Sequence, residues 1–152
     1  MKRLSILFVL SLCAAYCVAV ETTNHDSEDQ LVVFNNVTTG TPVALFHGVD
    51  DNCKNVQEWV DAIAEGINYT APVKCVEIGD GRVTSVFDKI ENQVQIACRK
   101  LHRDSDYRDQ EISIVGLSQG GLISRSLVEQ CEGLKVHTLY TFGGPHQGVS
   151  SF

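Results

Sequence analysis

The stretch of sequence that decides the fold is Ile112-Ser113-Ile114-Val115-Gly116-Leu117-Ser118-Gln119-Gly120. Its β-branched beginning predicts a strand, and it leads directly into the pattern Gly-x-Ser-x-Gly with a helix-forming stretch behind it. A strand-to-helix turn of this kind is typical of a nucleophile elbow, which holds a serine hydroxyl above a parallel sheet. Gly116 and Gly120 fit a turn too tight for a Cβ. We therefore take Ser118 as the candidate nucleophile, with an ordinary glycine turn as the alternative.

Length and composition are those of a soluble globular protein. The chain has 152 residues, of which 43% are hydrophobic and 20% charged. This length suits one domain with a hydrophobic core, and no linker or internal repeat divides it. The net charge of −7 and the lack of a basic stripe argue against nucleic acid as a partner.

The N-terminus differs from the rest of the chain. Met1-Lys2-Arg3 is basic, residues 4–20 are nearly all apolar, and Cys17-Val18-Ala19 offers small residues for cleavage. This pattern predicts a secretory signal peptide over residues 1–19, with an uncleaved membrane anchor as the alternative. We expect residues 20–40 to be a flexible mature N-terminus and the cleaved chain to have no stable membrane span.

Cysteines and sequons agree with a secretory route. Four cysteines remain after the signal peptide, and an even number in an oxidising compartment predicts disulfides. They are Cys53, Cys75, Cys98 and Cys131. Asn36 and Asn68 each begin an Asn-x-Thr triplet, so both are candidate glycosylation sites.

Apolar runs alternate with stretches of helical periodicity. We expect strands over 31–34, 42–46, 73–78, 112–115 and 136–142. Asn55 can cap a helix that runs to Ile67, a long helix over Thr84–Leu101 buries Phe87, and a third helix follows the elbow to about Gln130. Strands separated by helices of this length indicate a parallel sheet. We assign the domain to residues 41–152.

Four motifs occur in a fixed order along this domain. They are Phe46-His47-Gly48-Val49-Asp50-Asp51-Asn52-Cys53, Val76-Glu77-Ile78-Gly79, Gly116-Leu117-Ser118-Gln119-Gly120-Gly121 and Gly143-Gly144-Pro145-His146-Gln147-Gly148-Val149. Together they closely resemble palmitoyl-protein thioesterases, a lysosomal branch of the α/β-hydrolases, over Thr41–Val149. The resemblance implies an α/β-hydrolase fold, with a mostly parallel sheet flanked by helices.

The resemblance also implies an activity, which is hydrolysis of the thioester between a fatty-acyl chain and a protein cysteine. Ser118 would attack the thioester carbonyl and form an acyl-serine that water then hydrolyses. The backbone N–H groups of Val49 and Gln119 would form the oxyanion hole. The partners expected are S-acylated proteins or peptides with their fatty-acyl chain. No cofactor is expected, and the location implied is the lysosome or the secreted fraction.

Two residues depart from the family pattern in the loop that follows Phe46. Asp50 stands where the family usually has glycine, and aspartate tolerates unusual backbone angles better than most residues. Lys54 replaces a cysteine, so Cys53 either pairs elsewhere, for which Cys75 is the candidate, or stays free. The resemblance implies a second pair, a disulfide between Cys98 and Cys131.

The largest departure concerns the rest of the catalytic triad. In α/β-hydrolases the acid and then the histidine follow the serine, yet the sequence stops at Phe152, 34 residues after Ser118 (152 − 118). We expect the N-terminal part of an enzyme or a truncated product, without the C-terminal strands and the cap. His146 is the best internal candidate for the base, although the family's base is not at this motif. His47 is expected to order the oxyanion loop, and no cluster has metal-ligand spacing.

Two other functions remain open at this point. A related lipase or carboxylesterase would use the same nucleophile on oxygen esters, since only the acyl pocket separates the two classes. A catalytically dead truncated isoform, or a binding module, would follow from the absent acid and base.

Overall fold

The computed structural model describes residues 40–150, and its helices and strands all belong to one unit of the chain, residues 31–152. The predicted signal peptide, residues 20–39, the expected strand at 31–34 and Asn36 lie outside the described residues. Within 40–150 the elements are β1 (Val43–Phe46), α1 (Gln57–Gly66), β2 (Val73–Cys75), α2 (Arg82–Phe87), α3 (Ile90–Arg103), β3 (Glu111–Leu117), α4 (Gln119–Gln130) and β4 (Lys135–Phe142).

The four strands form one parallel sheet in the order β2-β1-β3-β4. Val43 lies beside Val73 on one side and beside Ser113 on the other, so β1 is an interior strand. Parallel neighbours need long crossovers, which the helices provide. The sheet confirms the predicted α/β architecture, and it brings the carboxyl ends of all four strands to one edge.

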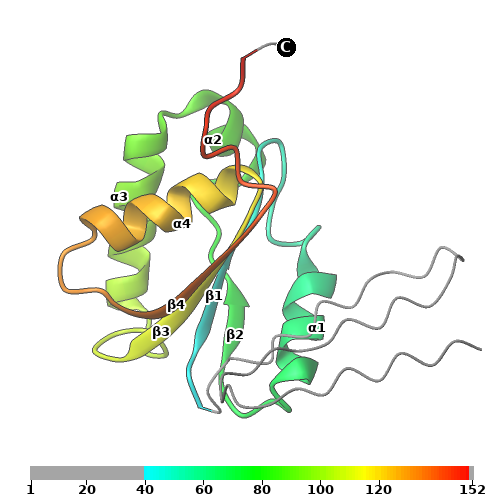
Figure 1. Cartoon of the computed structure of the whole chain (residues 1–152), viewed down its shortest axis with the longest axis vertical. Helices are drawn as coiled ribbons and strands as arrows, with labels where there is room; N and C mark the ends of the chain where they lie inside the picture. Colours follow the sequence, from blue (N-terminus) through cyan, green and yellow to red (C-terminus); the bar gives the residue numbers. More distant parts are fainter. Residues whose placement is uncertain (1–39, 151–152) are drawn as a thin grey trace, which may run out of the picture. The chain divides into compact units, whose positions relative to one another are not determined.

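Alternate residues of β1 face opposite sides of the sheet, as the pleat requires. Ala44 and Phe46 pack with buried residues of α3 and α4, whereas Val43 and Leu45 pack with buried residues of α1. Figure 1 shows the same division, with α3 and α4 on one face and α1 on the other. All four β1 residues are buried, because helices cover both faces of the sheet.

The prediction of one helix over Thr84–Leu101 was wrong. The segment forms two helices, α2 and α3, because Asp88 and Lys89 are extended with ψ angles of 150° and 143°. Phe87, expected on the buried face, is 81% exposed. Ile90, Val94, Ala97 and Leu101 do recur at helical spacing within α3. This spacing did not predict the break between α2 and α3.

A buried amide explains where the first of these helices ends. The side chain of Gln93 is 1% exposed and donates hydrogen bonds to the carbonyl oxygens of Thr84 and Asp88. The carboxylate of Asp88 accepts the N–H of Lys89 and the amide of Asn92. These bonds satisfy polar groups at the junction, so the chain turns there without leaving buried groups unpaired.

Two further boundaries differ from the prediction. The strand expected over 73–78 pairs only as far as Cys75, although Val76 and Ile78 stay buried. Asn55 does not cap α1, whose N-cap residue is Val56 without a side-chain hydrogen bond. The carbonyl oxygen of the Asn52 side chain instead accepts the N–H groups of Lys54 and Asn55, so the turn before the helix is closed by Asn52.

Candidate active site

Ser118 lies at the sharp turn between β3 and α4. Its φ and ψ angles are 52° and −119°, a backbone conformation that L residues rarely adopt. Its N–H donates to the carbonyl of Phe142 at 2.8 Å, so the end of β4 holds the turn. The residue is exposed at the edge where the strands end. A strained, exposed serine at this position is the geometry expected of a nucleophile elbow.

Close backbone packing explains the two glycines of the motif. A Cβ on Gly116 would lie 2.5 Å from the carbonyl oxygen of Gly120 and 2.6 Å from Cα of Gly121. A Cβ on Gly120 would overlap the carbonyl oxygens of Phe46 and His47. Neither position has room for a side chain, so the glycines let α4 approach β1 and β3.

The loop after β1 lies directly against the candidate nucleophile. A Cβ on Gly48 would be 3.2 Å from Cβ and 3.7 Å from Oγ of Ser118. The next residue, Val49, is 51% exposed. Gln119 is the first residue of α4, where the N–H has no partner within the helix. Val49 therefore follows a residue that packs against Ser118, and Gln119 follows Ser118 itself.

Asp50 adopts the left-handed conformation, with φ of 56°. This angle explains why glycine suits the position, and aspartate is one of the few other residues that accept it. The Asp50 carboxylate lies 2.7 Å from Nε of Arg82, whose guanidinium also donates to the Asp50 carbonyl. The loop therefore keeps its turn despite the departure from glycine.

His47 orients the peptide that carries the Val49 amide. The His47 ring is 5% exposed, and its Nδ1 lies 2.8 Å from the carbonyl oxygen of Gly48. That carbonyl and the Val49 N–H belong to the same peptide, which is trans, so the two groups point in opposite directions. Nε2 of the ring lies 2.6 Å from Oε1 of Glu77. The ring thus fixes the direction of the Val49 N–H.

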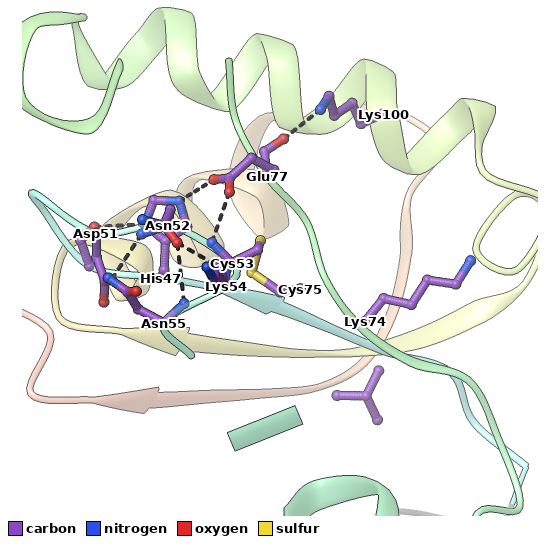
Figure 2. The surroundings of a disulfide bond; sticks show 12 residues. His47, Asp51, Asn52, Cys53, Lys54, Asn55, Lys74, Cys75, Glu77 and Lys100 are labelled. Carbon is purple, nitrogen blue, oxygen red and sulfur yellow. Dashed lines mark hydrogen bonds and ion pairs between the residues drawn. A yellow bond between two sulfur atoms is a disulfide. The ribbon is translucent and has the colours of Figure 1, made fainter. Parts of the chain in front are cut away.

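Glu77 and a disulfide close the same loop, which we call the oxyanion loop (residues 47–53; Figure 2). Oε2 of Glu77 accepts the N–H of Cys53 at 2.8 Å. Cys53 is joined to Cys75 at the end of β2, which settles the pairing left open by the sequence. His47 and Cys53, the two ends of the loop, are both held by the segment 75–77.

The sequence model of the family described as palmitoyl protein thioesterase matches residues 42–152. The chain belongs to this family. It is 27% identical over 131 residues to the palmitoyl-protein thioesterase-dolichyl pyrophosphate phosphatase fusion 1 of Schizosaccharomyces pombe, a match over 80% of this chain and 20% of that protein.

Two further relatives are named as palmitoyl-protein thioesterases and not as fusions. Palmitoyl-protein thioesterase 3 of Dictyostelium discoideum is 28% identical, over 74% of this chain and 38% of its own length. Palmitoyl-protein thioesterase 1 of Caenorhabditis elegans is 25% identical, over 76% of this chain and 41% of its own length. The chain thus spans well under half the length of the relatives it matches.

A solved structure confirms the fold. MenH from S. aureus superposes with a TM-score of 0.53 over 76% of this chain and 42% of its own, at 17% sequence identity. This neighbour has the α/β-hydrolase fold, and the likeness bears on fold alone.

No histidine in residues 40–150 hydrogen-bonds to Ser118 Oγ. His146, the internal candidate for a base, directs Nε2 to Oγ1 of Thr141 at 3.1 Å and packs over Gly144 in the loop after β4. Both ring nitrogens of His47 lie within hydrogen-bond distance of oxygens of Gly48 and Glu77. In the described part of the chain these two rings therefore have structural contacts.

The second disulfide joins Cys98 on α3 to Cys131 at the end of α4. The sequence showed no metal-ligand spacing, but the structure places His102 with these two cysteines, all ligand atoms within 4.8 Å of one another. Cysteine binds metal as a thiolate, and these two sulfur atoms are bonded to each other. The Cys98-to-His102 spacing on one helix face was the only sequence signal of this group.

A cavity of about 460 Å³ opens beside β2, away from Ser118. Its lining includes Lys74, Glu77, Lys100 and Tyr107. The carboxylate of Asp106, 2.6 Å from Nζ of Lys74, raises the pKa of that ammonium above its ordinary value. Burial raises the pKa of the Tyr107 hydroxyl, which donates to the carbonyl of Val43. The lining residues do not include the candidate nucleophile.

Asn68 lies in the turn after α1. It is exposed, with φ of 52°, and its N–H donates to the carbonyl of Glu65. The side chain of this sequon is therefore accessible. Among the described residues, no helix has the length and apolar character needed to cross a membrane.

Proposed function

We propose that the protein containing this chain hydrolyses fatty-acyl thioesters on protein cysteines, with Ser118 as the nucleophile. The observation that carries the proposal is the contact between the elbow and the oxyanion loop, with Gly48 packed against Ser118. Membership of the palmitoyl protein thioesterase family supports the thioester as the bond attacked. The substrates proposed are S-acylated proteins or peptides.

The proposed reaction begins at the hydroxyl of Ser118. Oγ of Ser118 attacks the acyl carbonyl carbon and passes its proton to a general base, which in α/β-hydrolases is a histidine. The oxygen becomes an alkoxide, which the N–H groups of Val49 and Gln119 stabilise by hydrogen bonds. The carbon–sulfur bond then breaks, the cysteine sulfur leaves as a thiol after taking up a proton, and water hydrolyses the acyl-serine to the fatty acid.

The location proposed is the lysosome or the secreted fraction. Two disulfides within residues 40–150 favour an oxidising compartment. The basic start and apolar run of residues 1–19 support a signal peptide, and the Asn36 and Asn68 sequons support glycosylation.

Hydrolysis assays on the full-length protein test the proposal. An S-palmitoylated peptide should be hydrolysed, and Ser118→Ala should lower kcat at least ~10³-fold, because the covalent step is lost. Ser105 is exposed and lies in the loop before β3, at the opposite end of that strand from the elbow, so Ser105→Ala is the matched control and should leave the rate unchanged. Unchanged thioester turnover in Ser118→Ala would overturn the proposal.

An oxygen ester of the same acyl chain separates the neighbouring class of enzyme. A thioesterase should hydrolyse the palmitoyl thioester with the higher kcat/KM. A higher kcat/KM on the oxygen ester would instead assign the protein to the lipases and carboxylesterases.

A further inference from the structure

The short helix α2 has one buried residue, Ser85. Its relative exposure is 4%, whereas its neighbours Val83, Val86 and Phe87 are 55%, 44% and 81% exposed. A serine that is buried on an otherwise exposed helix must have partners for its hydroxyl, because an unpaired buried hydroxyl is costly. Besides a hydrogen bond within α2, Ser85 contacts two different parts of the candidate active site, one through its hydroxyl and one through its backbone carbonyl.

The first partner is the oxyanion loop. Oγ of Ser85 accepts the N–H of Asp50 at 3.0 Å and donates to the carbonyl of Arg82 at 2.8 Å, so both of its hydrogen-bonding roles are used. Asp50 follows Val49 directly and has the left-handed φ of 56°. The hydroxyl therefore fixes the peptide on the far side of Val49 from the one that His47 fixes.

The second partner is the residue after the candidate nucleophile. The carbonyl oxygen of Ser85 accepts a hydrogen bond from Nε2 of Gln119 at 3.0 Å. Gln119 thus has its backbone N–H at the start of α4 beside Ser118 and its side chain tied to α2. In Figure 1, α2 lies at the same edge of the sheet as the start of α4 and the loop after β1.

We infer that Ser85 is a positioning residue that sets the spacing of the two oxyanion donors. The inference rests on the proposed function, since it assumes that the amides of Val49 and Gln119 receive the oxyanion. Ser85 joins the two segments that carry these donors. Along the chain, Val49 and Gln119 are separated by residues 50–118. An oxyanion hole works only when both donors are already placed, and an error of about 1 Å can cost ~10²-fold in rate.

Kinetics and inhibitor binding on the full-length protein test this role. Ser85→Ala removes the hydroxyl and should lower kcat about 10-fold with KM within twofold, because the loss acts on the developing oxyanion and not on the bound thioester. A trifluoromethyl ketone, which forms an oxyanion on Ser118, should bind more weakly by the same factor. A thioether analogue, which has no oxyanion, should bind unchanged.

Two other variants complete the design. Gln119→Met removes the side-chain amide and keeps the backbone N–H, so it should reproduce the same split if Ser85→Ala does not fold. Ser105→Ala is the control and should match wild type in every measurement. A melting temperature lowered without any change in kcat or ketone affinity, in Ser85→Ala or Gln119→Met, would show a structural role only and overturn the inference.

Different results would contradict the proposed function and the inference about Ser85. Wild-type protein that hydrolyses no acyl thioester would contradict the proposed function, and the inference about Ser85 would fall with it. Wild-type turnover with an unaffected Ser85→Ala would contradict the inference alone.

Discussion

One carboxylate, that of Glu77, holds both ends of the oxyanion loop. Oε1 lies 2.6 Å from Nε2 of His47, and Oε2 accepts the N–H of Cys53 at 2.8 Å. The His47 ring then contacts the carbonyl of Gly48 through Nδ1. The ring of His47 therefore connects the Glu77 carboxylate to the Gly48 peptide, and one side chain of the segment after β2 fixes both ends of the loop.

Glu77→Gln should therefore weaken catalysis as well as stability. The amide has one oxygen in place of the two carboxylate oxygens that contact the His47 ring and the Cys53 N–H, so we expect a loss of ~1–3 kcal/mol in stability and about 10-fold in kcat. Denaturant melts and steady-state kinetics on the same preparation measure both effects. Glu65→Gln, an exposed position, should change neither. A stability loss with an unaltered kcat would show that the loop does not depend on Glu77 for its catalytic shape.

The two disulfides should differ in their effect on catalysis. They span similar sequence separations, 22 residues for Cys53–Cys75 and 33 for Cys98–Cys131, so removing either should cost about 3 kcal/mol in the chain-entropy description. Only Cys53–Cys75 closes the oxyanion loop, whereas Cys131 lies at the other end of α4 from Ser118, ~18 Å along the helix.

Paired serine variants measure this difference. Cys53→Ser with Cys75→Ser should lower kcat of the folded protein severalfold, while Cys98→Ser with Cys131→Ser should lower the melting temperature alone. Equal kcat in the two double variants, measured well below their melting temperatures, would contradict the role given to Cys53–Cys75.

Glycine-to-alanine substitutions should have opposite signs at two positions. Gly120→Ala places a Cβ against the backbone carbonyls of Phe46 and His47, which cannot move without disturbing β1, so we expect a loss of at least ~3 kcal/mol. Gly66, at the end of α1, has open space around its Cβ position and a φ outside the left-handed region, so alanine there should stabilise by up to ~1 kcal/mol. Thermal melts decide both, and a well-folded Gly120→Ala protein would refute the packing described.

Asp104 should make a small, pH-dependent contribution to stability. The backbone N–H of Asp106, and then Lys74, lower the pKa of its carboxyl below the ordinary value of 3.8. A carboxyl whose pKa is lower in the folded than in the unfolded state stabilises the fold at a pH above its unfolded-state pKa. This stabilisation is lost as the pH falls through the folded-state pKa. Asp104→Asn should therefore cost ~0.5 kcal/mol at pH 7, after allowance for solvent screening, and nothing at acid pH below the folded-state value.

A neighbouring carboxylate provides the control for that measurement. Asp109 is 90% exposed, and Asp109→Asn should leave stability unchanged at both pH values. A difference between wild type and Asp104→Asn that persisted unchanged at acid pH would contradict the assignment.

Local chemistry explains why the elbow could be predicted. The strand, the glycines and the helix around Ser118 are adjacent in sequence, and the steric need for Gly116 and Gly120 arises within a few residues. The parallel sheet followed from alternating periodicities in the same way. Features set within one short segment are therefore open to sequence reasoning.

The missed features depend on contacts between distant segments. The roles of Glu77 and Ser85 require the register of β2 beside β1 and the placement of α2, neither of which the local pattern contains. The break before α3 was hidden because the apolar spacing continues to Phe87, although Asp88, a residue type common at helix ends, was a usable signal. The partner of Cys53 stayed open because connectivity cannot be deduced from sequence alone.

The most direct test of the central claim is to identify the acylated residue during turnover. The full-length protein would be mixed with a palmitoyl thioester, quenched in acid within the first turnover and digested for mass spectrometry. We predict a palmitoyl group on Ser118 that is absent from Ser118→Ala protein. Turnover accompanied by an acyl group on another residue, or by none on Ser118 at any quench time, would contradict the account.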